Sequence, residues 1–211
     1  MADDQAYTFD RSSLRFRSLE TGRFVPERDV RVAVDAVADL ASRRLGEASA
    51  RYRAGQITVT EFQAELMATI KESQIAAGLL AYGGRQQMDA SRWGLVGQQI
   101  RVQYQYARGM IADVLDGRQR LNGRLDGRAR QYGQAARSLY ENLRRRQSAE
   151  AGMAFEQNVL HAAESCRECL AATAAGVVPI GTLPPIGQRI CRQSCRCTLS
   201  YSRTMSEAEA A

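Results

Sequence analysis

Residues 166–197 read CRECLAATAAGVVPIGTLPPIGQRICRQSCRC and contain every cysteine of this 211-residue chain. The first two cysteines form a CxxC, and the other three follow after 21 residues as a CxxxCxC. In chain order they are Cys166, Cys169, Cys191, Cys195 and Cys197. The two sulfurs of a CxxC can point at one centre, and a second pair brought back by a folded loop completes a tetrahedral shell of thiolates around zinc. The spacing therefore predicts a structural zinc site.

Five sulfurs compete for the four positions of such a shell. We take Cys166 and Cys169 as one pair of ligands, and any two of the other three cysteines complete the set. Four thiolates around a divalent cation leave two negative charges, which neighbouring guanidinium groups would offset. The arginines beside the cysteines in the sequence are Arg167, Arg189, Arg192 and Arg196. His161 is expected to be a solvated or packed imidazole rather than a ligand.

Other states of the cysteines stay open at this point. Two disulfides with one spare thiol, or five unliganded thiols, would also fit the sequence. The odd number of cysteines and the lack of an apolar signal-peptide core in residues 1–25 favour reduced thiols. A thioredoxin-type redox pair is disfavoured, because no alternation of strands and helices surrounds Cys166. The apolar loop 170–190 is interrupted by glycine and proline, so a metal clip would explain how it folds.

Upstream of the cysteines, apolar residues recur at the three-and-four spacing of one helical face. This spacing predicts helices over about 26–54, from ITVTEFQ at 57–63 to about residue 80, and over 93–115. In the first helix the stripe consists of Val30, Val34, Val37, Ala41, Leu45 and Ala48. Thr60 and Gln63 are expected to form a capping box at the start of the second helix. A short glycine link then predicts that the second and third helices pack antiparallel.

The segments around these three helices are less regular. DGRQRLNGRLDGR at 116–128 predicts turns or a frayed loop with exposed arginines, since DG and NG favour positive φ. Further helices are expected over 129–147 and from about 148 to 162. The stretch LRFRSLETGRFVPERDV at 14–30 predicts a short hairpin that leads into the first helix.

The patterns together predict a mainly α fold. We expect a bundle of four to five helices with a short N-terminal β-hairpin arm and a small zinc-clipped C-terminal lobe. The expected divisions are an arm over 1–26, a helical body over 27–160, a cysteine-rich zinc-binding lobe over 161–203 and a disordered tail over 204–211.

Composition and motifs narrow the function. The chain is 45% hydrophobic and 25% charged, as globular domains are. His161 is the single histidine, which removes most nucleophile schemes that need a histidine base. The sequence contains no GxxxxGK[ST] phosphate-binding loop, and GGRQQM at 83–88 follows a helix rather than a strand, unlike a dinucleotide-binding motif. We therefore expect that the protein is not an enzyme.

The charge of the chain bears on its partners. The formal net charge is +6, and Lys71 is the lone lysine among 29 basic residues. An anionic partner would be met by planar, multidentate guanidinium groups, although a GC-rich coding sequence would also explain the arginine excess. No apolar segment approaches the ~18 residues of a spanning helix, so no membrane partner is expected.

Several of these stretches resemble a known family. SCREC at 165–169, LPPIG at 183–187 and CRQSCRCTLSY at 191–201, after a helical body, resemble the C-terminal signature of phage head-morphogenesis proteins, the Mu F-like minor head proteins. LETGRFV at 19–25 is similar to the TGRFV element near the start of such chains. The resemblance covers about 161–201, and more loosely 14–100. In the family the loop commonly ends in histidine and proline before CRC. Here Cys191 stands near that place, which leaves the fourth ligand open.

The resemblance implies a structural component of a bacteriophage virion, assembled in the host cytoplasm. Such proteins sit at the portal vertex or the inner capsid face and assist head assembly or genome packaging. The implied partners are capsid or portal subunits in a symmetric or vertex-associated assembly, with packaged DNA contacted through the arginine-rich surface. An alternative that needs no resemblance is a zinc-dependent, non-sequence-specific nucleic-acid-binding module, with the helices as a dimerisation platform.

Overall fold

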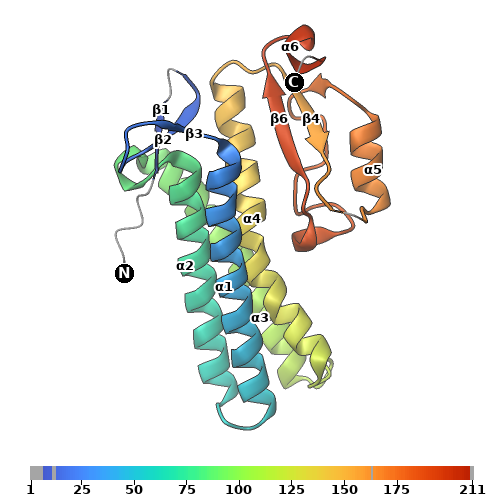
Figure 1. The fold of residues 1–211 in the computed structure, drawn as a ribbon. Coiled ribbons are helices and arrows are strands. Elements are labelled where there is room, and N and C mark those ends of the chain that lie inside the picture. The colour runs from blue at the N-terminus through green and yellow to red at the C-terminus, as the bar shows by residue number, and fades with distance from the viewer. Residues whose placement is uncertain (1–6, 11–12, 163, 210–211) are drawn as a thin grey trace.

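The computed structural model describes residues 7–10, 13–162 and 164–209, and its largest part is an elongated bundle of long helices (Figure 1). These are α1 (Glu27–Arg53), α2 (Val59–Tyr82), α3 (Ala90–Leu115) and α4 (Gly123–Glu150). A small sheet lies at the N-terminal end of α1, and a lobe with a second sheet lies beside α4. The predicted fold class is confirmed: the chain is mainly α, with an N-terminal hairpin and a C-terminal cysteine cluster that could hold a metal ion.

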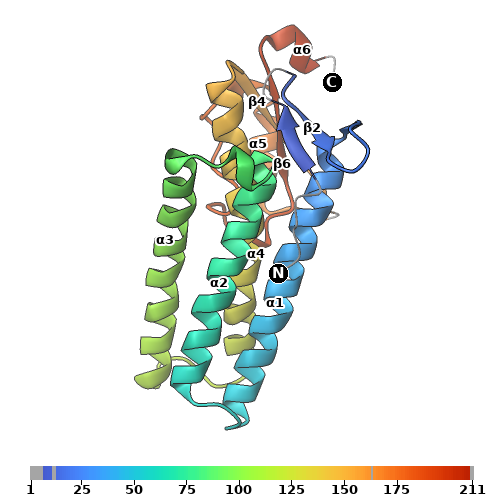
Figure 2. The same ribbon diagram turned by 90° about the vertical axis from the view of Figure 1, so that its left-hand side faces the viewer.

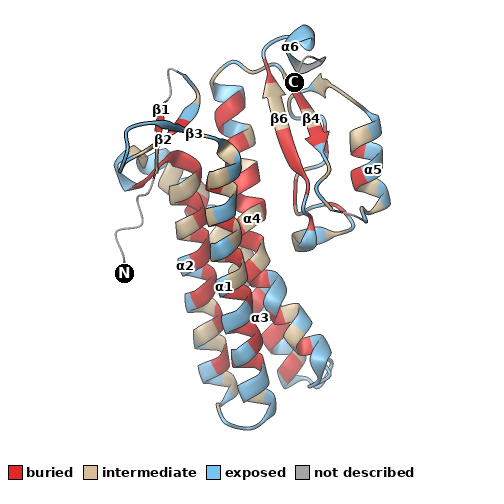
Figure 3. Ribbon diagram, viewed as in Figure 1, coloured by how far each residue is buried: buried red, intermediate tan, exposed pale blue. Residues whose placement is uncertain are grey.

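Apolar stripes form the core of the bundle, as their spacing predicts. Buried residues of α1, α2 and α4 face one another along the length of the helices (Figure 3). All members of the predicted α1 stripe are buried except Val37, which is half-buried. α3 packs mainly on α2, so it lies at the edge of the bundle (Figure 2).

The start of α2 differs from the prediction by two residues. The capping box consists of Thr58 and Glu61, not of Thr60 and Gln63. Thr58 Oγ1 accepts a hydrogen bond from the Glu61 amide at 3.2 Å, and the Thr58 amide donates to Glu61 Oε2 at 2.7 Å. Both residue pairs have the spacing of a capping box, and a carboxylate at the third helical position is also favoured by the helix dipole.

Gly133 lets α1 and α4 approach closely. A Cβ atom at this position would lie 2.3 Å from the backbone nitrogen of Ser42 and 2.7 Å from the carbonyl carbon of Ala41. These are backbone atoms, so they cannot move aside without shifting a helix. The Ser42 hydroxyl uses the same close approach to donate to the Arg130 carbonyl at 3.0 Å.

We expect Gly133→Ala to destabilise the bundle by about 1–3 kcal/mol, the range for overpacking a tight interface. Gly127→Ala is the matched control in the same helix, because nothing lies within 4 Å of its added Cβ. That control should raise stability by up to about 1 kcal/mol through helix propensity. Urea denaturation of both variants measures the difference. Equal effects of the two substitutions would show that α1 and α4 are not in close contact.

α4 begins earlier than the sequence predicts. The turn or loop expected over 116–128 ends at Asn122, whose side chain accepts from the Arg124 amide at 3.0 Å and caps the helix. Asp126 then lies in the first turns of α4, where it pairs with Arg53 at 2.7 Å and accepts from the Ser49 hydroxyl at 2.7 Å. These contacts with α1 outweigh the turn preference of the DG and NG dipeptides.

The N-terminal arm is a three-stranded antiparallel sheet in the order β1 (Tyr7–Asp10), β2 (Arg15–Ser18), β3 (Phe24–Val25). β2 and β3 are the predicted hairpin, and β1 is an additional strand. Residues 1–6 and 11–12 of the predicted arm lie outside the described residues. Phe9 and Phe16 bury their rings under the sheet, and the Arg144 guanidinium of α4 lies 4.6 Å and 5.0 Å from the two ring centroids.

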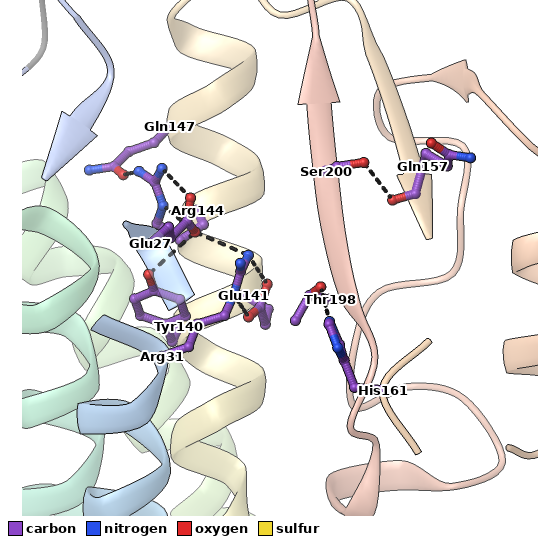
Figure 4. Close-up of polar contacts among 10 residues, drawn as sticks. All are labelled: Glu27, Arg31, Tyr140, Glu141, Arg144, Gln147, Gln157, His161, Thr198 and Ser200. Atoms are coloured by element: carbon purple, nitrogen blue, oxygen red, sulfur yellow. Dashed lines mark hydrogen bonds and ion pairs between the residues drawn. The ribbon is translucent and has the colours of Figure 1, made fainter. Parts of the chain in front are cut away.

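Buried charges fasten the start of α1 to α4 below this arm (Figure 4). Arg144 Nε donates to Glu27 Oε1 at 3.1 Å, and Arg31 Nε donates to Glu141 Oε1 at 2.8 Å. Burial raises the pKa of Glu141, because its side chain is 2% exposed, although Arg31 opposes the shift. The acids and bases balance within this cluster, so it serves to hold α1 on α4.

The lobe contains β4 (Phe155–Val159), α5 (Arg167–Ala174), β5 (Val178–Pro179), β6 (Thr198–Ser202) and α6 (Met205–Glu209), and its strands pair antiparallel in the order β5-β4-β6. The helix predicted from about 148 to 162 is wrong after Glu150, because residues 155–159 form β4. This strand precedes the predicted lobe boundary at residue 161. Residues 205–209 of the predicted disordered tail form α6, and 210–211 lie outside the described residues.

The lobe is fastened to α4 by buried polar contacts. Arg145 of α4 forms an ion pair with Glu156 of β4, in which the two side chains are 12% and 0% exposed. Glu156 Oε1 also accepts from the Leu183 amide at 2.9 Å. The Asn142 side chain donates to the Ile186 carbonyl at 3.3 Å, so both the sheet and the apolar loop are anchored to the same helix.

Candidate metal centre

Short elements at the base of the lobe carry the five cysteines. Cys166 is the N-cap of α5, and Cys169 lies in the first turn of that helix. Cys191 and Cys195 flank a short 3-10 helix, η2 (Arg192–Ser194), and Cys197 directly precedes β6. The pairing of β6 with β4 returns the chain to α5, so the two cysteine groups meet in space.

The sulfurs form two triplets that share Cys169. The first contains Cys166, Cys169 and Cys191, the second contains Cys169, Cys195 and Cys197, and the sulfurs of each triplet lie within 4.8 Å of one another. Cys169 Sγ is 3.6 Å from Cys191 Sγ and 3.7 Å from Cys195 Sγ. Zinc–sulfur bonds of ~2.3 Å in a tetrahedron give a sulfur–sulfur edge of about 3.8 Å. The cluster could therefore hold a metal ion.

None of the five cysteines is in a disulfide. The sulfur separations far exceed the ~2.05 Å of an S–S bond, so the disulfide alternative does not describe this structure. Cys169, Cys195 and Cys197 are each 2% exposed, whereas Cys166 and Cys191 are half-buried. The cluster therefore has one side against the lobe interior and one side toward solvent.

Arg189 is the arginine that accompanies the sulfurs inside the protein. It is 1% exposed, and its NH1 donates to Cys169 Sγ at 3.6 Å and to Asn158 Oδ1 at 2.7 Å. None of the ion pairs among the described residues includes Arg189, and its buried NH2 has no hydrogen-bond partner. A buried guanidinium without an anionic partner is costly, so negative charge on the sulfurs it faces would stabilise it.

The other three arginines predicted to offset the site are exposed: Arg167, Arg192 and Arg196. Among the described residues, the hydrogen bond from a guanidinium to a cysteine sulfur comes from Arg189 and not from these three. Of the four arginines predicted to offset the charge of the site, Arg189 alone is buried with the sulfurs, and the role of the three exposed ones stays a prediction.

Asn158 and Glu168 support the cluster and were missed by sequence analysis. The side-chain nitrogen of Asn158 donates to Thr173 Oγ1 at 2.7 Å and to the Cys169 carbonyl at 3.4 Å. The side-chain oxygen of Asn158 accepts a hydrogen bond from Arg189. Glu168 accepts from the Ile190 amide at 2.5 Å, which fixes the residue before Cys191. Asn158 gives no local signal, since its stretch has helical spacing. Glu168 lies inside the CxxC, and its hydrogen-bond partner, the Ile190 amide, is 22 residues away in the sequence.

His161 lies outside the two sulfur triplets. The residue is exposed, and its Nε2 lies 2.9 Å from Thr198 Oγ1 of β6 (Figure 4). The imidazole therefore contacts the sheet beside the centre rather than the sulfurs, in line with the expectation for this residue.

Burial raises the pKa of three of the five thiols. It raises the pKa of Cys191 to about 12 and also raises the pKa of Cys169 and of Cys197. Burial also acts to raise the pKa of Cys166, but hydrogen bonds with Cys169 and Cys191 outweigh it and lower that pKa to about 7. A metal must displace these protons, because thiolates are the ligands.

Metal binding should therefore release protons and weaken as the pH falls. Any four of the five cysteines include at least two of the three with raised pKa. We expect at least two protons released per Zn²⁺ bound at pH 7, with affinity lost progressively toward pH 5. Titration in weak buffer with a pH indicator measures the release, and Mg²⁺, which prefers oxygen ligands, is the control. Release of fewer than two protons would mean that the thiols are already ionised without metal.

No family model matches the chain, and no curated protein or solved structure matches it either. The resemblance to phage head-morphogenesis proteins thus stays a prediction from the quoted residues. Among the described residues, no helix combines the length and the apolar character needed to cross a membrane.

Proposed function

We propose that the cysteine cluster is a structural zinc centre with Cys166, Cys169, Cys191 and Cys195 as ligands. The observation that carries this proposal is buried Arg189, whose guanidinium faces Cys169 and lacks a carboxylate partner among the described residues. Four thiolates around a divalent ion carry two negative charges, which would supply the missing anion.

We take Cys166, Cys169 and Cys191 as three of the ligands and Cys195 as the fourth, because its sulfur lies 3.7 Å from that of the shared Cys169. Cys195 belongs to the second triplet, so metal binding would have to draw its sulfur toward the first. Cys197 is left as a buried thiol that interacts with Cys169 and with Asn158. A shell closed by four protein sulfurs leaves no position for substrate, which favours a structural role over a catalytic one.

Thiolate shells of this kind also suit iron, so the metal itself needs a direct measurement. Elemental analysis of protein purified under reducing conditions should find about one zinc per chain. A value below about half a zinc per chain would exclude the zinc centre. Iron found in its place would change the proposed identity of the metal but not the proposed cysteine ligands.

We further propose that the chain is a structural minor head protein of a bacteriophage, located in the virion. The quoted resemblance supports this role, and so does the construction of the molecule. A metal-clipped lobe fixed to a rigid bundle through Arg145 and Glu156 is suited to hold a fixed surface against capsid or portal subunits. In this role the protein acts in head assembly or genome packaging through protein–protein contacts.

Fractionation of phage particles tests this role. The chain should travel with purified heads through a density gradient at a fixed ratio to the capsid subunit, and it should stay with them after a high-salt wash. Recovery of the chain only in the soluble pool would overturn the proposal.

The second candidate is the nucleic-acid-binding module predicted from the arginine content. The exposed arginines beside the centre favour it, because Arg167, Arg192 and Arg196 form no ion pair among the described residues. In this case the soluble protein should shift DNA in a salt-dependent manner, and removal of the metal should abolish the shift.

A further inference from the structure

The outer face of α3 is free of carboxylates over most of its length. Six residues at helical spacing form an exposed stripe, which we call the α3 stripe: Gly94, Gln98, Arg101, Gln105, Arg108 and Ala112. Tyr106 is 63% exposed beside it. An added Cβ at Gly94, Gly97 or Gly109 would meet no atom within 4 Å, so this face of the helix is open along its backbone.

The other exposed helix faces have a different composition. α1 exposes Glu47 among its arginines, and α2 exposes Glu61 and Glu72. Their basic residues are partly neutralised, since Arg44 pairs with Glu72 at 3.3 Å. By contrast, none of the ion pairs among the described residues includes Arg101 or Arg108.

The positive surface continues past the end of α3. Asp113 and Asp116 are the acids at this end, and both are held by arginines: Arg118 pairs with Asp113 at 3.0 Å and with Asp116 at 2.7 Å. Arg120 in the following loop and Arg124 in the first turn of α4 are exposed and take part in no ion pair of the described chain.

We propose that the α3 stripe, together with Arg120 and Arg124, binds the sugar–phosphate backbone of nucleic acid without reading its sequence. Guanidinium groups pair bidentately with phosphate, and glutamine side chains donate to phosphate and sugar oxygens. Arg101 and Arg108 stand seven residues apart, about 10 Å along a helix, so they reach different phosphates. The open glycine positions let the backbone of the duplex approach the helix.

A nucleic acid fits this face better than an acidic protein does. Protein interfaces are built around a buried apolar centre, and the six residues of the α3 stripe include no large apolar side chain, although Leu115 and Leu121 are exposed singly near its C-terminal end. A polyanion needs only unpaired cations and polar donors in a row, which the stripe supplies. The inference goes beyond the structural role proposed above and does not depend on zinc, because these residues lie on α3 and the segment after it rather than in the lobe.

Salt-dependent binding of a labelled 25-base-pair duplex of arbitrary sequence tests the inference. The test variant is Arg101→Gln with Arg108→Gln. The matched control is Arg23→Gln with Arg43→Gln, which removes the same charge from exposed positions of the arm and α1. Loss of two phosphate contacts should reduce the magnitude of the negative slope of log K against log salt by about 1.8, while the control keeps the wild-type slope.

Several outcomes would overturn the inference. These are no wild-type binding at 50 mM salt, equal loss in the test and control variants, or displacement of the duplex by poly-glutamate as effectively as by unlabelled duplex, which would indicate an acidic protein partner. A Cys169→Ser variant should bind the duplex as the wild type does. Loss of binding in that variant would place the contact on the lobe instead, while the zinc proposal would be unaffected.

Discussion

Cys169→Ser should release the metal and loosen the C-terminal lobe while the helical bundle stays folded. Cys169 belongs to both sulfur triplets, so neither group of three close sulfurs survives without it. The substitution also removes the sulfur that accepts a hydrogen bond from buried Arg189 and that would carry negative charge once metal is bound. The apolar loop with its glycines and prolines has few backbone hydrogen bonds of its own, so a metal clip would contribute to holding it.

The effect can be located by two measurements. Limited proteolysis should cut within residues 155–203 of the variant, at sites protected in the wild type. Helicity by circular dichroism should barely change, because the lobe contributes only the eight residues of α5 and the five of α6. The bundle keeps its own apolar core of α1, α2 and α4.

Cys197→Ser is the matched control, since it makes the same chemical change at the sulfur outside the proposed ligand set. It should keep about one zinc per chain and the wild-type protease pattern. Metal loss in this variant would assign Cys197 to the shell in place of another ligand. Loss of the bundle helices in Cys169→Ser would show instead that lobe and bundle unfold as one cooperative unit.

Glu156→Ala should destabilise the protein by about 3–5 kcal/mol, the usual cost of stranding one member of a buried ion pair. Arg145 would keep a guanidinium that is 12% exposed without its partner, and the Leu183 amide would lose its acceptor. Because these contacts join β4 and the apolar loop to α4, the loss should fall first on the junction of lobe and bundle.

The neighbouring arginine provides a control for this result. Arg146 pairs with Glu150 at 2.8 Å on the solvent side of α4, where both side chains are about half exposed. Glu150→Ala should therefore leave the free energy of unfolding nearly unchanged, since water and salt screen an exposed pair. Urea denaturation of both variants measures the contrast. Equal effects would contradict the burial of the Arg145–Glu156 pair.

The sequence determined the features whose causes are local. Apolar spacing predicts α1, α2 and α3. Helical hydrogen bonds join residues four apart, so the residues of one buried face recur every three or four positions in the sequence. The cysteine spacing likewise identified the residues that gather at the base of the lobe. The predicted capping box of α2 lies two residues after the observed one, because two residue pairs in the same stretch have the spacing of the motif.

Tertiary structure decided the features that depend on distant partners. Phe155 and Val159 have the spacing of a helix, yet they form a strand because β6, about forty residues later, supplies the hydrogen bonds. Four arginines lie beside the cysteines in the sequence, and Arg189 is the one that is buried against a sulfur. The packing of the loop decides this, and the sequence pattern does not show it. Asp126 became part of a helix because Arg53 and Ser49 meet it from α1. Strand pairing and the burial of charge join residues far apart in the chain, so a local pattern cannot encode them.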